Sequence, residues 1–337
     1  MGGGGWEQRA RNIGKHSMTL HQDSRIFVAG HRGLVGSAIL RRLAAEGFSN
    51  LVTRTRDELD LTDQPEVRAF FDREGIEHVF LAAARVGGIL ANERQGADFI
   101  RDNLLIQTNV IDAAWRAGVK KLLFLGSSCI YPRLAEQPMR EESLLTGPLE
   151  PTNKPYAVAK IAGIAMCQAY RKQYGFNAIC AQPANLYGPG DHFEPESSHV
   201  LPGLIRRFHD AKAAGAPSVT LWGTGTPRRE FLYVDDMADA CVHLMRHYDE
   251  AEIINVGNGE DIAIRDLAEL VRETVGYAGR IEQDLSKPDG HPRKVVDVTR
   301  LAATGWRAKT GLAEGVRQTY AWFLENGASR AIAAAAE

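Results

Sequence analysis

The chain has 337 residues, of which 24% are charged and 44% hydrophobic, and its formal net charge at pH 7 is −2. A nearly neutral chain has no general electrostatic attraction to nucleic acid, and its apolar runs are too short to span a membrane. The four cysteines form no C-x-x-C pair and are too few for a disulfide scaffold, which favours a reducing, cytoplasmic location. No His, Cys or Asp grouping has metal-ligand spacing, so we expect no metal.

Residues 1–24 do not resemble part of a fold. They contain the run Gly2–Gly5 and no apolar periodicity, and they lack the apolar stretch of a secretory signal. We therefore expect a disordered extension there, and a frayed helix end in the Ala-rich segment from 328 to 337.

Between residues 25 and 187, apolar runs alternate with helical patterns. The expected strands are 25–29, 51–53, 77–83, 121–125 and 177–183, and the expected helices are 34–46, 65–73, 98–117 and 156–174. This alternation predicts an α/β, Rossmann-like fold with a doubly wound parallel sheet. We assign 25–187 to a Rossmann domain, a fold that binds dinucleotides.

Beyond residue 188 the sequence becomes richer in Pro, Gly and His, with helical patterns at 200–213, 235–248 and 264–275. This pattern predicts a smaller C-terminal α/β region, 188–330, that binds the substrate. Residues 235–256 are expected to return to the main sheet.

The glycines of Gly30-x-x-Gly33-x-x-Gly36 follow the first strand and open a helix. In that position, glycines permit a tight turn and let the backbone approach a pyrophosphate, whose charge the helix N-terminus favours. A glycine-rich turn without a ligand is the alternative.

The end of the second strand bears on the choice between NAD and NADP. An acidic residue there would bind the ribose hydroxyls, but the chain reads Arg54-Thr55-Arg56. Arg56 and Arg32 can pair with a 2′-phosphate, although Asp57 follows at once and the arginines could simply be solvated. We predict NADP(H).

Tyr156 and Lys160 are spaced to share one face of a helix. The ammonium can lower the pKa of the phenol and help it exchange a proton with a carbonyl or alcohol oxygen. Among the nine tyrosines only Tyr156 has Lys at i+4. Ser127, just after the strand at 121–125, is placed to hydrogen-bond the same oxygen.

Cys129 and His199 suggest chemistry beyond hydride transfer. A thiolate can remove a C–H proton next to a ketone, and a histidine can return a proton to the opposite face. The alternatives are a small buried hydrophobe for Cys129 and a helix-start histidine for His199.

Several long motifs occur in one order: AGHRGLVG (29–36), LGSSCIYP (125–132), PTNKPYAVAK (151–160), NLYGP (185–189), SHVLP (198–202) and REFLYVDD (229–236). With them, the chain from Arg25 to Asn326 resembles the extended short-chain dehydrogenase/reductase family of nucleotide-sugar enzymes. Within it, the motifs resemble those of the bifunctional enzymes that epimerise a GDP-4-keto-6-deoxy sugar at C3 and C5 and reduce its 4-keto group.

The resemblance implies a role for each matching position. Ser127, Tyr156 and Lys160 would form the reductase triad, Cys129 the base and His199 the acid. The implied substrate-binding residues are Arg207, Trp222, Arg229 and Asp289. The implied cofactor-binding residues are Gly30, His31, Arg32, Gly33, Leu34, Val35, Gly36, Arg56, Asp57, Glu58, Leu59, Asp60, Leu61, Leu125, Gly126, Ser127, Ser128, Lys160, Pro183, Ala184, Asn185, Leu186 and His199. The implied partners are NADP(H), a GDP-sugar and a second copy of the chain, with no nucleic acid or membrane.

Two other functions are compatible with parts of the sequence. A nucleotide-sugar 4-epimerase, 4-ketoreductase or 4,6-dehydratase would share the fold, although a dehydratase would carry an Asp-Glu pair where Ser128 and Cys129 stand. A non-catalytic dinucleotide-binding scaffold would have no need of Ser127, Tyr156 and Lys160.

Overall fold

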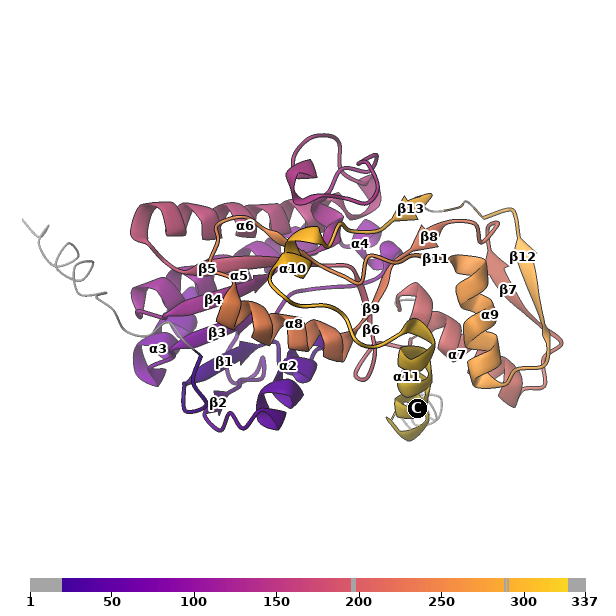
Figure 1. Cartoon of the computed structure of the whole chain (residues 1–337), viewed down its shortest axis with the longest axis horizontal. Helices are drawn as coiled ribbons and strands as arrows, with labels where there is room; N and C mark the ends of the chain where they lie inside the picture. The colour runs from indigo at the N-terminus through magenta and orange to yellow at the C-terminus, as the bar shows by residue number, and fades with distance from the viewer. Residues whose placement is uncertain (1–19, 195–197, 288, 290, 327–337) are drawn as a thin grey trace, which may run out of the picture.

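The structure is a computed structural model, and it describes residues 20–194, 198–287, 289 and 291–326. Figure 1 shows a main body built around one sheet, with a smaller region beside it that later parts of the chain form.

Six strands make up the main sheet: β1 (Ile26–Ala29), β2 (Leu51–Val52), β3 (His78–Leu81), β4 (Lys121–Leu125), β5 (Ala178–Pro183) and β10 (Ile254–Val256). They are parallel and lie in the order β10-β5-β4-β3-β1-β2. Every residue of β1, β3, β4 and β5 is buried, which explains their nearly unbroken apolar sequence. Strand β2 lies on one side of β1, and β3 and the later strands lie on the other side, so the strand order reverses between β1 and β3. Folds of this kind bind ligands at that position.

Helices cover both faces of this sheet. One face packs against α3 (Gln64–Glu74), α5 (Gly96–Arg116) and α6 (Lys154–Tyr174), and the other against α2 (Leu34–Ala45), α8 (Val234–His247) and α10 (Thr299–Ala303). The two faces thus carry separate apolar cores, and the described chain is a doubly wound α/β protein as the sequence predicts.

Helix ends follow local chemistry. The Asp63 side chain accepts a hydrogen bond from the Glu66 amide at the start of α3, and Gly75 ends that helix with a φ of 60°. Gly175 ends α6 with a φ of 68°. Side chains with a Cβ rarely adopt this left-handed conformation, so these glycines fix where the helices stop.

The smaller region has its own apolar core, with Phe208, Leu267 and Phe323 near its centre. It contains α7 (Val200–Ala213), α9 (Ile264–Val275) and α11 (Leu312–Asn326), with short strands β7 (Ser218–Trp222), β8 (Arg228–Arg229), β11 (Ile262–Ala263), β12 (Arg280–Asp284) and β13 (Arg293–Lys294). Strands β6 (Asn185–Tyr187) and β9 (Phe231–Tyr233) pair where the region joins the main body. The chain therefore crosses between the two parts several times.

The sequence-based element list was incomplete. It omitted the short strands β6–β9 and β11–β13 as well as α4 (Ile89–Arg94) and α10, because two- to six-residue elements carry little periodicity. It also missed the 15-residue helix α11. The folded part also begins before Arg25: Leu20 is 5% exposed and packs into the core beside α2 and α8. The rest of the expected extension, 1–19, and the segment 327–337 lie outside the described residues.

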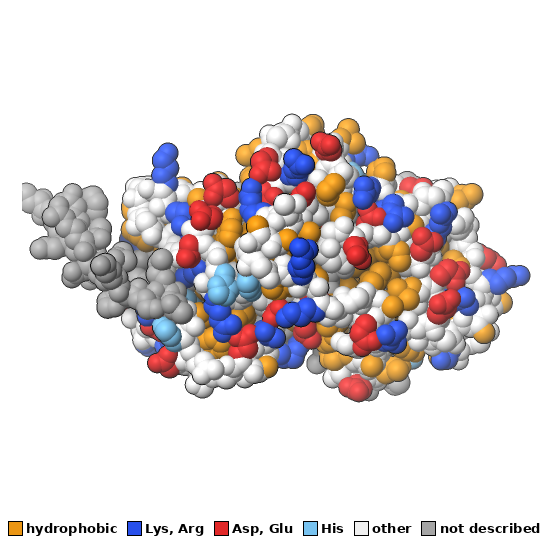
Figure 2. Space-filling view, in the orientation of Figure 1, with side chains coloured by type: hydrophobic (Ala, Val, Ile, Leu, Met, Phe, Trp, Pro, Cys, Tyr) orange, Lys and Arg blue, Asp and Glu red, His pale blue; other side chains and the backbone are white. Residues whose placement is uncertain are grey.

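Charged side chains of both signs are interspersed over the face shown in Figure 2, in keeping with the small net charge. Within the described ranges, no helix is both long and apolar enough to cross a membrane.

Candidate active site

The predicted site residues gather at the carboxyl edge of the sheet. The segments that leave β1, β3, β4 and β5 all emerge there, because the carboxyl ends of parallel strands meet at one edge. The smaller region adds α7, β8 and β13 to this edge, so both parts of the chain contribute to one site.

The loop after β1 leaves no room for side chains at two glycines. A Cβ on Gly30, which has a φ of 84°, would lie 2.7 Å from the Ala83 nitrogen, and a Cβ on Gly36 would lie 2.1 Å from the Gly30 carbonyl oxygen. Helix α2 begins after Gly33. Among the described residues, no side chain caps its N-terminus, and its first turn contains no acidic residue. The amides of its first turn are thus available to an anion.

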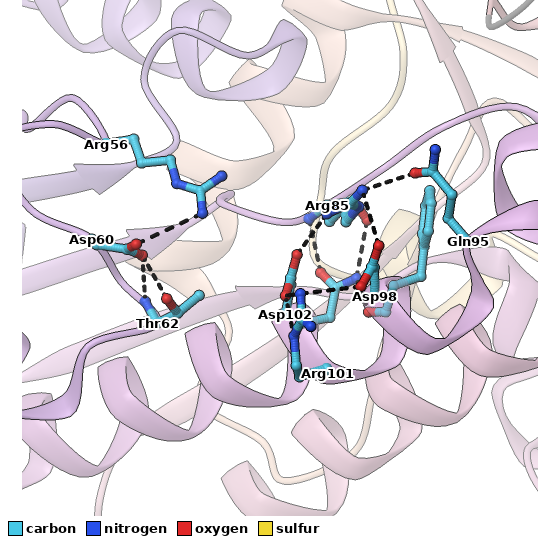
Figure 3. Close-up of polar contacts among 10 residues, drawn as sticks. Arg56, Asp60, Thr62, Arg85, Gln95, Asp98, Arg101 and Asp102 are labelled. Carbon is cyan, nitrogen blue, oxygen red and sulfur yellow. Dashed lines mark hydrogen bonds and ion pairs between the residues drawn. The ribbon is translucent and has the colours of Figure 1, made fainter.

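A second loop packs against the first. Ala83 and Arg85 belong to the segment after β3, and Figure 3 shows the Arg85 guanidinium between Asp102, Asp98 and Gln95. Its two terminal nitrogens lie 2.8 Å from an Asp102 oxygen and 2.8 Å from the Gln95 amide oxygen. These contacts to α5 fix the loop against Gly30. The sequence analysis did not assign this loop to the site.

The loop after β2 carries the arginine predicted to select NADP(H). The Arg56 side chain is 77% exposed and lies 3.7 Å from Asp60, whose oxygen also accepts hydrogen bonds from Thr62 (Figure 3). Those bonds from Thr62, with the charge of Arg56 adding to them, lower the pKa of the Asp60 carboxyl. Thr62 bonds to one Asp60 oxygen and Arg56 pairs with the other; such an exposed ion pair is weak, so Arg56 can exchange it for another anion.

The turn after β4 holds Ser127 and Cys129. The Ser127 amide donates to the Gln182 side-chain oxygen at 3.0 Å, and the Cys129 amide donates to the Ser127 hydroxyl at 3.2 Å. Any Cβ on Gly126 would lie 1.8 Å from the same Gln182 oxygen, so only glycine lets β5 hold this turn so closely. Gln182 has no motif signature and was not predicted.

Helix α6 places Tyr156 and Lys160 over this turn. The Lys160 ammonium donates to the Leu125 carbonyl at 2.8 Å and lies 4.9 Å from the centre of the Phe124 ring and 5.8 Å from that of Tyr156. Ser127, Tyr156 and Lys160 are therefore neighbours, although Ser127 comes from a different element.

Burial changes the proton affinity of both side chains on α6. It raises the pKa of the Tyr156 phenol, as does nearby Cys129, while a hydrogen bond with the Ser127 side chain acts in the opposite direction. Burial also lowers the pKa of Lys160 to about 8. The sequence-based expectation was a lowered pKa for the phenol through Lys160; the structure instead gives a raised pKa, because the phenol is buried, and among the described residues the only opposing effect comes from Ser127.

Cys129 is half-buried and faces a cation that the sequence analysis did not single out. The Lys294 ammonium lies 3.5 Å from the Cys129 sulfur. His199, the residue before α7, is exposed on one side. Protein packed against its other side lowers the pKa of the imidazole, and the charges of Lys294 and His192 lower it further. Lys294 therefore acts electrostatically on His199 while it contacts Cys129.

The four residues predicted to bind the GDP-sugar all lie in the smaller region. Arg207 of α7 donates to the Thr220 carbonyl of β7 at 3.1 Å, and Trp222 ends that strand with 60% of its side chain exposed. Asp289 accepts hydrogen bonds from the Thr224 amide and hydroxyl, at 2.9 and 2.7 Å. Arg229 pairs in register with Lys294, which connects this group to Cys129.

The segment from 183 to 186 is anchored by two hydrogen bonds. Ala184 bonds through its amide to Val256, and the Asn185 side chain donates to the Glu230 carbonyl at 2.7 Å, so the 183–186 segment is fixed beside the triad. The described residues contain no group of three or more His, Cys, Asp and Glu side chains placed to hold a metal ion.

Comparison with known proteins gives consistent relatives. Residues 26–257 match the model of the NAD dependent epimerase/dehydratase family. The chain is 61% identical over 311 residues to "Probable GDP-L-fucose synthase 1" of Oryza sativa subsp. japonica, an alignment that covers 92% of this chain and 95% of the relative. It is 56% identical over 311 residues to the GDP-L-fucose synthase of Escherichia coli (strain K12), covering 90% and 97%.

A solved structure shares the fold. The GDP-L-fucose synthetase of Naegleria fowleri, bound to NADP, superposes with a TM-score of 0.87 at 30% identity, over 92% of this chain and 96% of the other.

Gly36→Ala tests the glycine loop. Since the added methyl group collides with the Gly30 carbonyl, we expect the loop to open and the affinity for NADPH, measured by fluorescence titration, to fall at least about tenfold. Gly311→Ala is the control, because a Cβ there meets nothing within 4 Å. A folded Gly36→Ala protein that binds NADPH as tightly as the wild type would contradict this account of the loop.

Proposed function

The chain belongs to the NAD dependent epimerase/dehydratase family, and we propose that it converts GDP-4-keto-6-deoxy-D-mannose to GDP-L-fucose by epimerisation at C3 and C5 and NADPH-dependent reduction at C4. The observation that carries the proposal is that Cys129 lies in the same turn as Ser127, directly beneath Tyr156 and Lys160. A reductase needs Ser127, Tyr156 and Lys160. The Cys129 thiol beside them would serve a different step, the removal of a proton from carbon.

NADP(H) fits the glycine loop, whose two crowded glycines and uncapped helix end form a cradle for a pyrophosphate. When bound, it supplies the hydride for C4 of the sugar. Arg32 and Arg56, both exposed beside this cradle, would hold the 2′-phosphate. The segments 125–128 and 183–186 would line the nicotinamide end.

Tyr156 is suited to be the acid of the reduction. Its phenol has an ordinary pKa of about 10, and burial raises that pKa. The group therefore carries its proton at neutral pH and can pass it to the oxygen on C4 as that oxygen becomes an alkoxide. Lys160, held by the Leu125 carbonyl, supplies positive charge beside the phenol, and Ser127 donates a second hydrogen bond to the same oxygen.

Cys129 and His199 would carry out the epimerisations. The 4-keto group acidifies the C–H bonds at C3 and C5, and Ser127 and Tyr156 stabilise the oxygen of the resulting enolate. Cys129 takes the proton, and His199 returns one to the opposite face of the carbon. The same oxygen site can therefore serve all three steps.

The nucleotide end of the substrate would lie against the smaller region. Arg207 and Arg229 would neutralise the diphosphate, while the exposed Trp222 ring and Asp289 would contact the base or sugars. With the diphosphate at Arg229 of β8, the sugar would extend toward Cys129.

We also propose that two copies associate through α5 and α6 in the cytoplasm. Leu105 of α5 is 40% exposed and Val158 of α6 is 37% exposed, although apolar side chains tend to be covered. The four cysteines, all within the described ranges, are free thiols, as in a reducing compartment. Sedimentation velocity of the protein and of Leu105→Glu would test the dimer; a wild-type monomer would refute it.

The direct test incubates the protein with GDP-4-keto-6-deoxy-D-mannose and NADPH. The proposal requires one NADPH oxidised for each GDP-L-fucose formed, with the product identified by NMR. Oxidation that leaves C3 and C5 unchanged would indicate a plain 4-ketoreductase. Interconversion without net NADPH consumption would indicate a 4-epimerase.

The reduction should depend on pH through Lys160. The ammonium is present below its pKa of about 8 and is lost above it, so kcat/KM for reduction should fall as the pH rises through about 8. Initial rates from about pH 6 to about pH 10 at limiting sugar would show the decline. A flat profile across that range would mean that the charge of Lys160 has no part in the reaction.

Tyr156→Phe should remove the proton donor and keep the ring. We expect kcat for NADPH oxidation to fall by roughly 10²- to 10⁴-fold while the Kd for the GDP-sugar stays near that of the wild type. Tyr170→Phe, on the same helix but bonded to Asp112, is the matched control and should retain activity. Wild-type turnover by Tyr156→Phe would rule out the assignment.

Cys129→Ser should impair epimerisation more than cofactor binding, because a hydroxyl is a far weaker base than a thiolate. Deuterium exchange at C3 and C5 of the sugar, followed by NMR in deuterated water without NADPH, should slow by about 100-fold or more. NADPH affinity should not change. Exchange at the wild-type rate would exclude Cys129 as the base.

A further inference from the structure

The Lys294 side chain contacts the Cys129 thiol. Its ammonium lies 3.5 Å from the sulfur, although the two residues are 165 positions apart in the chain. Lys294 is partly buried and forms no ion pair with a carboxylate among the described residues. The sulfur is therefore in position to interact with this ammonium when the thiol loses its proton.

The strand that carries Lys294 is rigidly held. In β13, Lys294 pairs with Arg229 of β8, and its carbonyl accepts the Glu230 amide at 3.2 Å. The next two residues, Val295 and Val296, are each 1% exposed. A backbone anchored on both sides fixes the direction of the lysine side chain and reduces the entropy lost when it meets the sulfur.

Glu230 provides much of this anchoring. It is 0% exposed, and its carboxylate accepts amide hydrogen bonds from Val296 at 2.8 Å, Asn258 at 2.7 Å and Gly259 at 2.8 Å. No basic side chain of the described residues bonds to it. Burial raises the pKa of the Glu230 carboxyl to about 7, against the effect of these amides. The carboxylate thus joins the segment after β13 to the loop after β10.

The charged and titratable groups around the thiol come from three elements. Tyr156 of α6 interacts electrostatically with Cys129, and Lys294 of β13 contacts it. His199 before α7 is reached by the charge of Lys294. Of these three groups, only Lys294 carries an ammonium, and it is the one in contact with the sulfur.

We propose that Lys294 is a further catalytic residue that stabilises the thiolate form of Cys129, and that Glu230 is the positioning residue for the strand that carries it. This inference rests on the role of base proposed above for Cys129. In the step, the C–H bond breaks and an S–H bond forms, and the electron pair of the broken bond enters the enolate. Lys294 keeps its own proton throughout and loses its anionic partner as the thiol forms, which favours the next ionisation.

Alkylation by iodoacetamide measures the thiolate directly and needs no substrate. Cys129 is the half-buried cysteine and the other three are buried, so mass spectrometry can follow its modification alone. The reagent is neutral, hence a change in protein charge does not alter its approach. The rate is measured against pH for the wild type, Lys294→Met and Lys294→Arg.

We expect Lys294→Met to slow alkylation of Cys129 roughly tenfold at pH 7 and to move the half-maximal rate to higher pH. Lys294→Arg should stay close to the wild type because it keeps the charge. Lys309→Met, which removes an exposed lysine paired with Asp239, is the control for lost charge and should match the wild type. A wild-type pH profile for Lys294→Met overturns the proposal.

Glu230→Gln tests the positioning part. It should shift the alkylation profile in the same direction as Lys294→Met but by less, since the lysine charge remains. An unchanged profile in Glu230→Gln overturns the role of Glu230 and leaves that of Lys294 intact. If Lys294→Met shifts alkylation but the wild type exchanges no deuterium at C3 or C5, the contact with the thiolate stands and the base role of Cys129 fails.

Discussion

The hydrogen bond from the Lys160 ammonium to the Leu125 carbonyl holds the site together. It joins α6 to the end of β4 in a place where burial already lowers the pKa of the lysine to about 8. A buried cation costs free energy unless it is bonded, so this contact fixes how α6 lies on the sheet. Tyr156, one turn earlier on the helix, is thereby held above Ser127 and Cys129. The position of the proton donor follows from this contact, and that of the thiol from the Gln182 bond to the Ser127 turn.

The site also depends on the smaller region meeting the main body at the carboxyl edge of the sheet. The main sheet supplies the glycine loop and the Ser127 turn, while the smaller region supplies Arg229 and Lys294 through a pair of two-residue strands. Such short strands are weak alone, and buried Glu230 compensates by accepting amides from both neighbouring segments. The lysine that faces the thiol is therefore held by the same elements that would carry the diphosphate of the substrate.

Much of this could be predicted from the sequence. Fully buried strands have a distinct composition, and glycines such as Gly75 and Gly175 mark where helices end, so the doubly wound fold was predictable. The spacing of Tyr156 and Lys160 brings them onto one helix face without any knowledge of the fold. The contacts of Lys294 and Gln182 were not predictable, since neither lies in a recognisable motif and both depend on how distant segments pack. The pKa of Tyr156 was also misjudged, because spacing reveals the nearby cation and not the loss of water.

The central claim is that one oxygen site serves both epimerisation and reduction. The most direct test runs the wild-type reaction with NADPH in deuterated water and locates the label in the product by NMR. The account predicts deuterium at C3 and C5, which exchange with solvent through the enolate, and ordinary hydrogen at C4, which comes from the cofactor. A reduced product without deuterium at C3 and C5 would contradict it.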